Sequence, residues 1–139
     1  MMLSPPSEPE APLTRPRSRR YWRDKFRVAC RGLKLGIRGH SSFSVHFFFA
    51  ALVLASAIVL QCDFWQWCVL LGCIGFVLTA ELFNSALETL FRGLDEATRE
   101  RSWPALDVAA GAVLMASITA SIIGGLILLY QLARLLHLW

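Results

Sequence analysis

Three long apolar runs constrain the fold of this chain more than any other feature. They extend over residues 43–61, 64–83 and 108–130, and each is close to the roughly 20 residues with which an α-helix crosses a bilayer. Hydrophobic residues make up 55% of the 139 residues, and an excess this segregated is not typical of a soluble domain or a nucleic-acid-binding fold. We therefore predict an all-α membrane protein, a helical bundle whose transmembrane helices cover about 43–61, 64–90 and 104–130.

The residues before the first span form two further segments. Residues 1–20 hold five of the six prolines and can bury too little apolar surface to offset the entropy of ordering, so we expect a disordered tail. Residues 21–38 place apolar side chains such as Trp22 and Phe26 on one stripe and basic side chains on the next. This pattern favours an amphipathic helix in the membrane interface, and the alternative is a soluble amphipathic helix packed on a core. Residues 21–139 would form one membrane domain.

The distribution of positive charge predicts the orientation. Residues 1–40 hold ten of the 14 Lys and Arg residues, and Arg92, Arg99 and Arg101 lie in the link between the second and third spans. The short turn at 62–63 carries no positive charge. Because basic residues concentrate on the cytoplasmic side of membrane proteins, we expect the N-terminus and the second link to be cytoplasmic.

A row of polar residues lies at the end of the second apolar run. Glu81, Asn84, Ser85 and Glu88 are spaced i, i+3, i+4 and i+7, which places them on one face of a helix. Carboxylates within an apolar span are costly and by default indicate a functional site. The alternative is that they only form hydrogen bonds between helices. His46, near the start of the first span, is either a polar anchor at the membrane boundary or the partner of a site carboxylate.

Asp107 is expected at the same membrane level as this row. Ser102-Trp103-Pro104 is typical of a helix start, with Ser102 as the N-cap and Pro104 in the first turn. Carboxylates at the cytoplasmic surface suit phosphoryl transfer, which needs Mg²⁺ on oxygen ligands, positive charge on the phosphates and a carboxylate that orients or deprotonates the attacking hydroxyl. At that surface a lipid alcohol can arrive laterally and ATP can arrive from the cytosol.

The third apolar run repeats small residues every four positions. Such spacing lets helix backbones approach closely in lipid, so we predict a helix–helix interface along Ala112, Ala116, Ala120 and Gly124. We also expect self-association, because three helices alone bury little polar surface.

Three segments carry a resemblance to a known family: RGLK at 31–34, AELFNSALE at 80–88 and ALDVAAGAVL at 105–114. Over about 21–129 the chain resembles the prokaryotic diacylglycerol kinase and undecaprenol kinase family of integral-membrane lipid kinases, which are unrelated to soluble kinases. The resemblance implies a homotrimer in the bacterial inner membrane, with Mg²⁺ and ATP bound in sites shared between subunits. The expected product is phosphatidic acid from diacylglycerol, or undecaprenyl phosphate from undecaprenol.

The resemblance also implies roles for individual residues. Glu81 is expected to be the catalytic base on the lipid hydroxyl, and Glu88 a ligand of Mg²⁺. Asn84 and Asp107 are expected in the nucleotide site, and Lys34 is expected to contribute positive charge to the phosphates.

Two positions depart from the family pattern. His40 stands where members commonly carry a metal-binding Glu, and Leu106 stands where they commonly carry Lys before the Asp of the third span. We hypothesise that Lys34, Arg38 or Arg92 replaces the missing positive charge. The alternatives to a kinase are a non-catalytic membrane scaffold or lipid-binding protein that keeps the fold, and a small subunit of a larger membrane complex.

Overall fold

The computed structural model describes residues 22–39 and 41–137. These residues form four helices and no strand, with three helices that are long and apolar enough to cross a membrane. The predicted all-α membrane bundle is confirmed, whereas the tail predicted for 1–20 lies outside the described residues. The helices are α1 (Trp22–Gly39), α2 (Ser42–Val59), α3 (Phe64–Arg92) and α4 (Glu96–Leu135).

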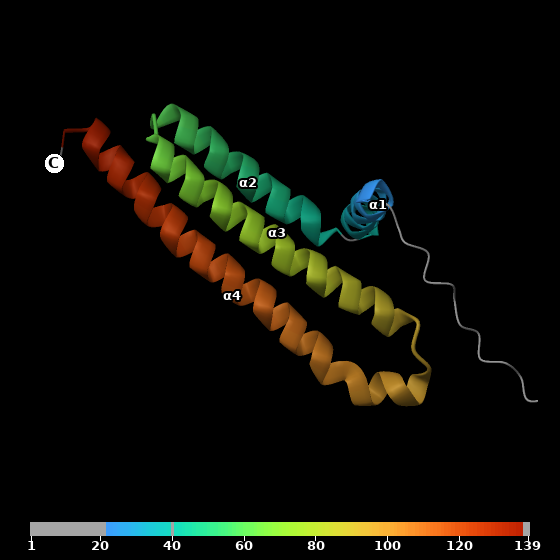
Figure 1. Cartoon of the computed structure of the whole chain (residues 1–139). Helices are drawn as coiled ribbons and strands as arrows, with labels where there is room; N and C mark the ends of the chain where they lie inside the picture. The colour runs from blue at the N-terminus through green and yellow to red at the C-terminus, as the bar shows by residue number, and fades with distance from the viewer. Residues whose placement is uncertain (1–21, 40, 138–139) are drawn as a thin grey trace, which may run out of the picture.

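Figure 1 shows α2, α3 and α4 side by side, with α3 and α4 continuing past the N-terminal end of α2. The 18 residues of α2 correspond to about 27 Å, which nearly matches a hydrocarbon core of about 30 Å. The 40 residues of α4 correspond to about 60 Å, so α4 must extend beyond that core. The first turn of α2 therefore marks one membrane boundary, and the parts of α3 and α4 beyond it lie at the membrane surface.

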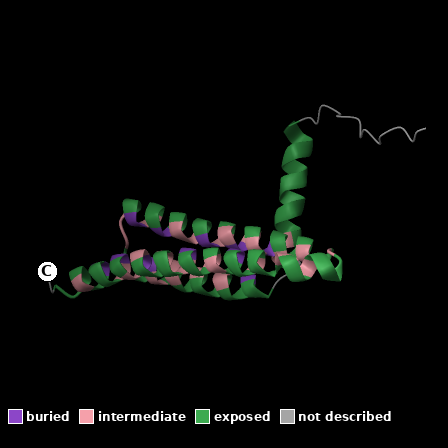
Figure 2. Cartoon of the chain, turned by 90° about the horizontal axis from the view of Figure 1, so that it is seen from below, coloured by how far each residue is buried: buried purple, intermediate pink, exposed green. Residues whose placement is uncertain are grey.

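Helix α1 projects from one side of the bundle, transverse to the other helices, at the end where α2 begins (Figure 2). This direction is compatible with the interfacial position that the amphipathic pattern of α1 predicts. It contacts α3 through Gly36, which lies against the side chain of Leu82. The glycine permits a close approach, because a Cβ atom at this position would collide with Leu82.

The interior of the bundle is narrow and built around small residues of α4. Ala116 and Gly124 are buried against α3, and the nearest atom to a Cβ placed on Gly124 would be a methyl carbon of Leu70. The predicted small-residue interface is thus met in part, because Ala116 and Gly124 are buried, Ala120 is half-buried and Ala112 is exposed. Most large apolar side chains point outward instead, as the green outer faces in Figure 2 show, and this arrangement suits a lipid surrounding.

Amide side chains close the end of the bundle that lies opposite α1. The Asp63 N–H donates to Gln66 Oε1 (2.7 Å), and Gln66 Nε2 donates to Gln131 Oε1 (3.3 Å). Gln131 Nε2 in turn donates to the carbonyl oxygen of Gln61 (2.9 Å), and Arg134 pairs with Asp63 at 2.8 Å. We call Gln66 and Gln131 the amide clamp, because they join the α2–α3 turn to α4.

The predicted start of the last helix at Ser102 is wrong. Helix α4 begins at Glu96, where Asp95 is the N-cap and its carboxylate accepts a hydrogen bond from the Thr98 N–H at 3.1 Å. Pro104 consequently lies inside the helix, where it has no N–H to donate to the preceding turn. Figure 1 shows a bend in the first part of α4, which this missing hydrogen bond explains.

Candidate active site

Glu81 lies in α3 at the level of the first turns of α2. Its side chain is only 3% exposed. Ser42 Oγ donates a hydrogen bond to one carboxylate oxygen, and His46 Nε2 lies 3.8 Å from the other. Ser42 and His46 are four residues apart and therefore share one face of α2. This face provides partners for a carboxylate that would otherwise be buried without them at the membrane boundary. Of the two roles considered for His46, polar anchor or partner of a site carboxylate, the structure supports the second.

Asn84 and Glu88 continue the same face of α3 toward the surface. Asn84 Nδ2 donates to Glu88 Oε1 at 2.9 Å, and Arg92 lies 3.3 Å from Glu88 Oε2. Glu88 is thus held between an amide and a guanidinium, and it stays partly exposed. Ser85 points inward instead, is 1% exposed, and has a hydroxyl without a hydrogen-bond partner among the described residues.

A cavity of about 320 Å³ brings several predicted site residues together where α3 and α4 extend past α2. Asn84 and Glu88 line it from α3, and Asp107 lines it from α4. Two carboxylates and an amide therefore surround one open space at the membrane surface. The full lining comprises Asn84, Glu88, Phe91, Arg92, Trp103, Leu106, Asp107 and Ala110.

The structure does not bring every predicted residue into this cavity. Glu81 precedes Glu88 by seven residues, or about 10 Å along the helix axis, and it faces α2 rather than the cavity. Lys34 is exposed on α1 and is not among the lining residues. Of the substitutes proposed for the missing lysine, Arg92 lines the cavity together with Leu106. His40 lies outside the described residues.

The cavity also has an aromatic wall that sequence reasoning missed. The rings of Phe91 and Trp103 meet edge to face at a centroid distance of 5.4 Å. Arg99 lies over the Phe91 ring and donates to the carbonyl oxygens of Arg92 and Leu94 at 3.2 and 3.3 Å. Arg99 thereby fixes the α3–α4 link that holds the two walls together. No local signal in the sequence reveals this wall, because Phe91 and Trp103 lie on different helices and meet only through the way α3 and α4 pack.

The comparisons with known proteins place these residues in a family. Residues 27–128, well over half of the chain, match the sequence model described as prokaryotic diacylglycerol kinase. The chain belongs to the prokaryotic diacylglycerol kinase family. This result confirms the predicted resemblance.

One curated relative in this family is a diacylglycerol kinase from Synechocystis sp., which is 34% identical to the chain over 112 residues. The match covers 80% of the chain and 64% of the relative, so the chain spans somewhat less than two thirds of that relative's length. The comparison with solved structures found no match.

Proposed function

We propose that this protein is an ATP-dependent lipid kinase that phosphorylates the hydroxyl of a membrane lipid alcohol, with diacylglycerol as the first candidate substrate. The observation that carries the proposal is the buried carboxylate of Glu81, held by Ser42 and His46 at the membrane boundary. Membership of the prokaryotic diacylglycerol kinase family and the name of the Synechocystis relative support the same activity.

In this proposal Glu81 acts on a hydroxyl that reaches it from the lipid phase. In the proposed reaction its carboxylate accepts the proton of the lipid hydroxyl, and the oxygen attacks the γ-phosphorus of ATP. The bond between that phosphorus and the bridging oxygen breaks, so that the products are a lipid phosphate and ADP. Ser42 and His46 keep the carboxylate oriented toward the substrate, which is the main contribution a protein can make to phosphoryl transfer besides stabilising charge.

The surface cavity is the proposed site of the nucleotide and its metal, and the triphosphate would extend from the cavity toward Glu81, about 10 Å along α3. Magnesium is commonly bound by one or two carboxylates together with substrate phosphates and water. Glu88 and Asp107 supply such oxygens on opposite walls of the cavity. Residues 22–39 and 41–137 contain no group of three or more His, Cys, Asp or Glu side chains that could hold a metal without the nucleotide. The residues thus fit Mg²⁺ bound jointly with ATP, where the ion would neutralise phosphate charge. Asn84 and Arg92 add polar and positive groups, and Lys34 would have to approach from α1.

The same proposal includes the assembly and the orientation. We propose a homotrimer in which a neighbouring copy completes the open cavity, in the bacterial inner membrane, with the cavity on the cytoplasmic side. The basic residues of α1 and of the α3–α4 link lie at that end, which supports this orientation.

Undecaprenol is the second candidate substrate, because His46 and Leu106 resemble the undecaprenol kinase branch of the family. Both lipids present a primary hydroxyl at the interface. The distinguishing experiment incubates the purified full chain in mixed micelles with labelled ATP and offers each lipid separately, with and without magnesium. We expect magnesium-dependent label in one of the two lipids. A well-folded protein that labels neither lipid would favour the non-catalytic scaffold, for which the departures at His40 and Leu106 would then be the reason.

A further inference from the structure

The carboxylate of Glu88 is already engaged at both oxygens inside the surface cavity. Asn84 Nδ2 donates to Oε1 at 2.9 Å, and Arg92 Nη2 lies 3.3 Å from Oε2. Asp107 lines the same cavity from α4, and its carboxylate has no ion-pair partner among the residues that the structure describes. The two carboxylates proposed to hold the metal therefore differ, because the protein itself neutralises one of them.

The ion pair between Arg92 and Glu88 is weak enough to be exchanged for other partners. The Arg92 side chain is 63% exposed and that of Glu88 is 36% exposed. Their separation of 3.3 Å is also longer than the roughly 2.8 Å of a strong charge-assisted hydrogen bond. An exposed pair of this kind changes an equilibrium constant by a factor of about five at most. A phosphate group, in contrast, offers a guanidinium two parallel hydrogen bonds.

A phosphate and a divalent cation act on this pair in the same direction. The phosphate attracts the guanidinium of Arg92, and a cation at Glu88 repels it, because like charges at contact distance oppose each other. Both ligands therefore favour a state in which Arg92 has left Glu88.

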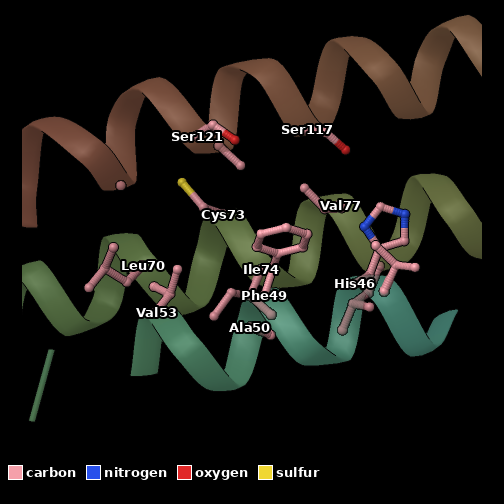
Figure 3. A pocket seen from close by; sticks show the side chains of 14 residues that line it. His46, Phe49, Ala50, Val53, Leu70, Cys73, Ile74, Val77, Ser117 and Ser121 are labelled. Atoms are coloured by element: carbon pink, nitrogen blue, oxygen red, sulfur yellow. The ribbon is translucent and has the colours of Figure 1, made fainter. Parts of the chain in front are cut away.

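A second cavity, of about 310 Å³, lies between α2, α3 and α4 (Figure 3). Most of its lining is apolar or small, as Val53, Leu70 and Ser121 illustrate, and no carboxylate or guanidinium of the described residues lines it. A phosphate or a metal ion would lose its water there without gaining a charged partner. The exchange of charged partners is therefore confined to the surface cavity.

We propose that Arg92 exchanges partners when the nucleotide binds. Without nucleotide its guanidinium holds Glu88 Oε2. With nucleotide it binds a phosphate oxygen and leaves Glu88 to the metal ion that accompanies the phosphates. Arg92 is then a phosphate-binding residue that also keeps Glu88 from binding a metal ion alone. The inference rests on the proposed kinase function, and it adds a coupling between the nucleotide and its metal.

A double-mutant cycle on the binding of metal-free ATP tests the exchange without turnover. The purified full chain in a neutral detergent is dialysed against labelled ATP in the presence of EDTA. Arg92→Gln should weaken ATP binding about tenfold, because a charged hydrogen bond to phosphate is lost. Glu88→Gln should strengthen ATP binding about fivefold when Arg92 is present, since Glu88 no longer competes for the guanidinium. In the Arg92→Gln background the same Glu88→Gln substitution should change ATP binding by no more than about twofold.

Asp107→Asn is the matched control for this cycle, because Asp107 is the other carboxylate of the cavity and is not paired with Arg92. Its effect on ATP binding should be the same with arginine or glutamine at position 92. If the effect of Glu88→Gln is equally independent of residue 92, Arg92 acts only as a nearby charge, and the exchange is overturned.

The metal side of the exchange is measured with Mn²⁺ alone, which takes the same kind of oxygen ligands as Mg²⁺ and is detected by electron paramagnetic resonance. Arg92→Gln should bind Mn²⁺ about fivefold more tightly than wild type, because Glu88 is then released. Arg101→Gln, which removes an exposed charge that does not line the cavity, should bind Mn²⁺ like wild type.

Unchanged Mn²⁺ affinity in Arg92→Gln would overturn the exchange. A wild-type protein that binds ATP only in the presence of metal would also overturn it, because the phosphates would then not draw Arg92 away by themselves. A protein that shows the coupling but phosphorylates no lipid would contradict the proposed kinase function alone.

Discussion

Replacing Gln131 with leucine should destabilise the bundle through the amide clamp. Gln131 is 2% exposed and Gln66 is fully buried. The substitution removes the hydrogen bond from Gln66 Nε2 and the hydrogen bond to the Gln61 carbonyl. The Gln66 amide then remains buried between α3 and α4 without its acceptor.

The expected cost follows from these two hydrogen bonds. Hydrogen bonds between membrane helices contribute about 0.6 kcal/mol on average and up to about 1.7 kcal/mol. A buried donor left without a partner costs roughly 1–3 kcal/mol. The energy of the hydrogen bond and the cost of the unpaired donor describe the same lost interaction, so the two values are not added. We expect Gln131→Leu to lower the free energy of unfolding by about 2 kcal/mol.

The assay is unfolding of the purified protein by a denaturing detergent in mixed micelles, arranged as a double-mutant cycle. Gln66→Leu should cost a similar amount to Gln131→Leu. The double mutant should cost less than the sum of the two, with a coupling of about 1 kcal/mol, because neither amide is then left unpaired. Thr79→Val is the control, since among the described residues the Thr79 hydroxyl donates to the Gly75 carbonyl of its own helix and joins no second helix. Additive single mutants would refute the reasoning.

Two further predictions concern α1 and the start of α4. Gly36→Leu should displace α1, because the new side chain collides with Leu82, and should speed hydrogen exchange in α1. Adding Leu82→Ala should restore the protection from exchange. Unchanged exchange in the single mutant would contradict the contact between Gly36 and Leu82. The pKa of the Asp95 carboxyl lies below its ordinary value because of hydrogen bonds from the Thr98 side chain and backbone N–H. Its cap is therefore fully present above the ordinary pKa of Asp and is lost as the pH falls through the lowered value. The NMR shift of the Thr98 amide should follow this titration and should lose it in Asp95→Asn, so that a titration which persists in the variant would exclude Asp95 as its source.

The sequence alone was sufficient to predict the membrane-crossing helices, because a bilayer requires apolar runs of a certain length and such runs can be counted directly in the sequence. It was also sufficient for Glu81 and Glu88, since a carboxylate in an apolar run is too costly to be incidental. Helical spacing correctly placed both on one face of α3. What spacing could not show is that they have different surroundings. Helix α2 begins beside Glu81 and is absent beside Glu88, so one carboxylate is buried and the other opens to the surface cavity.

The start of α4 shows a second limit. Ser102 and Pro104 form a good local signal for a helix start, but Asp95 provides an earlier cap and the chain continues as a bent helix through the proline. Local signals compete, and the interactions that decide between them come from elsewhere in the fold. Here Arg99 donates to the carbonyl oxygen of Arg92, the last residue of α3, and to that of Leu94 in the link, and so supports the earlier start. The amide clamp depends in the same way on residues about 65 positions apart, which no local pattern reveals.

The most direct test of the central claim is the initial rate of phosphate transfer from labelled ATP to the lipid alcohol, compared between wild type, Glu81→Gln and Glu100→Gln. Glutamine at position 81 keeps the size of the side chain but cannot accept the proton. Glu100 is exposed and lies outside both cavities, so it is the matched control. The account predicts that Glu81→Gln lowers the rate about a hundredfold or more, with an intact oligomer and with the control near wild type. Full activity of an intact Glu81→Gln protein would contradict the account, because the buried carboxylate would then have no part in the reaction.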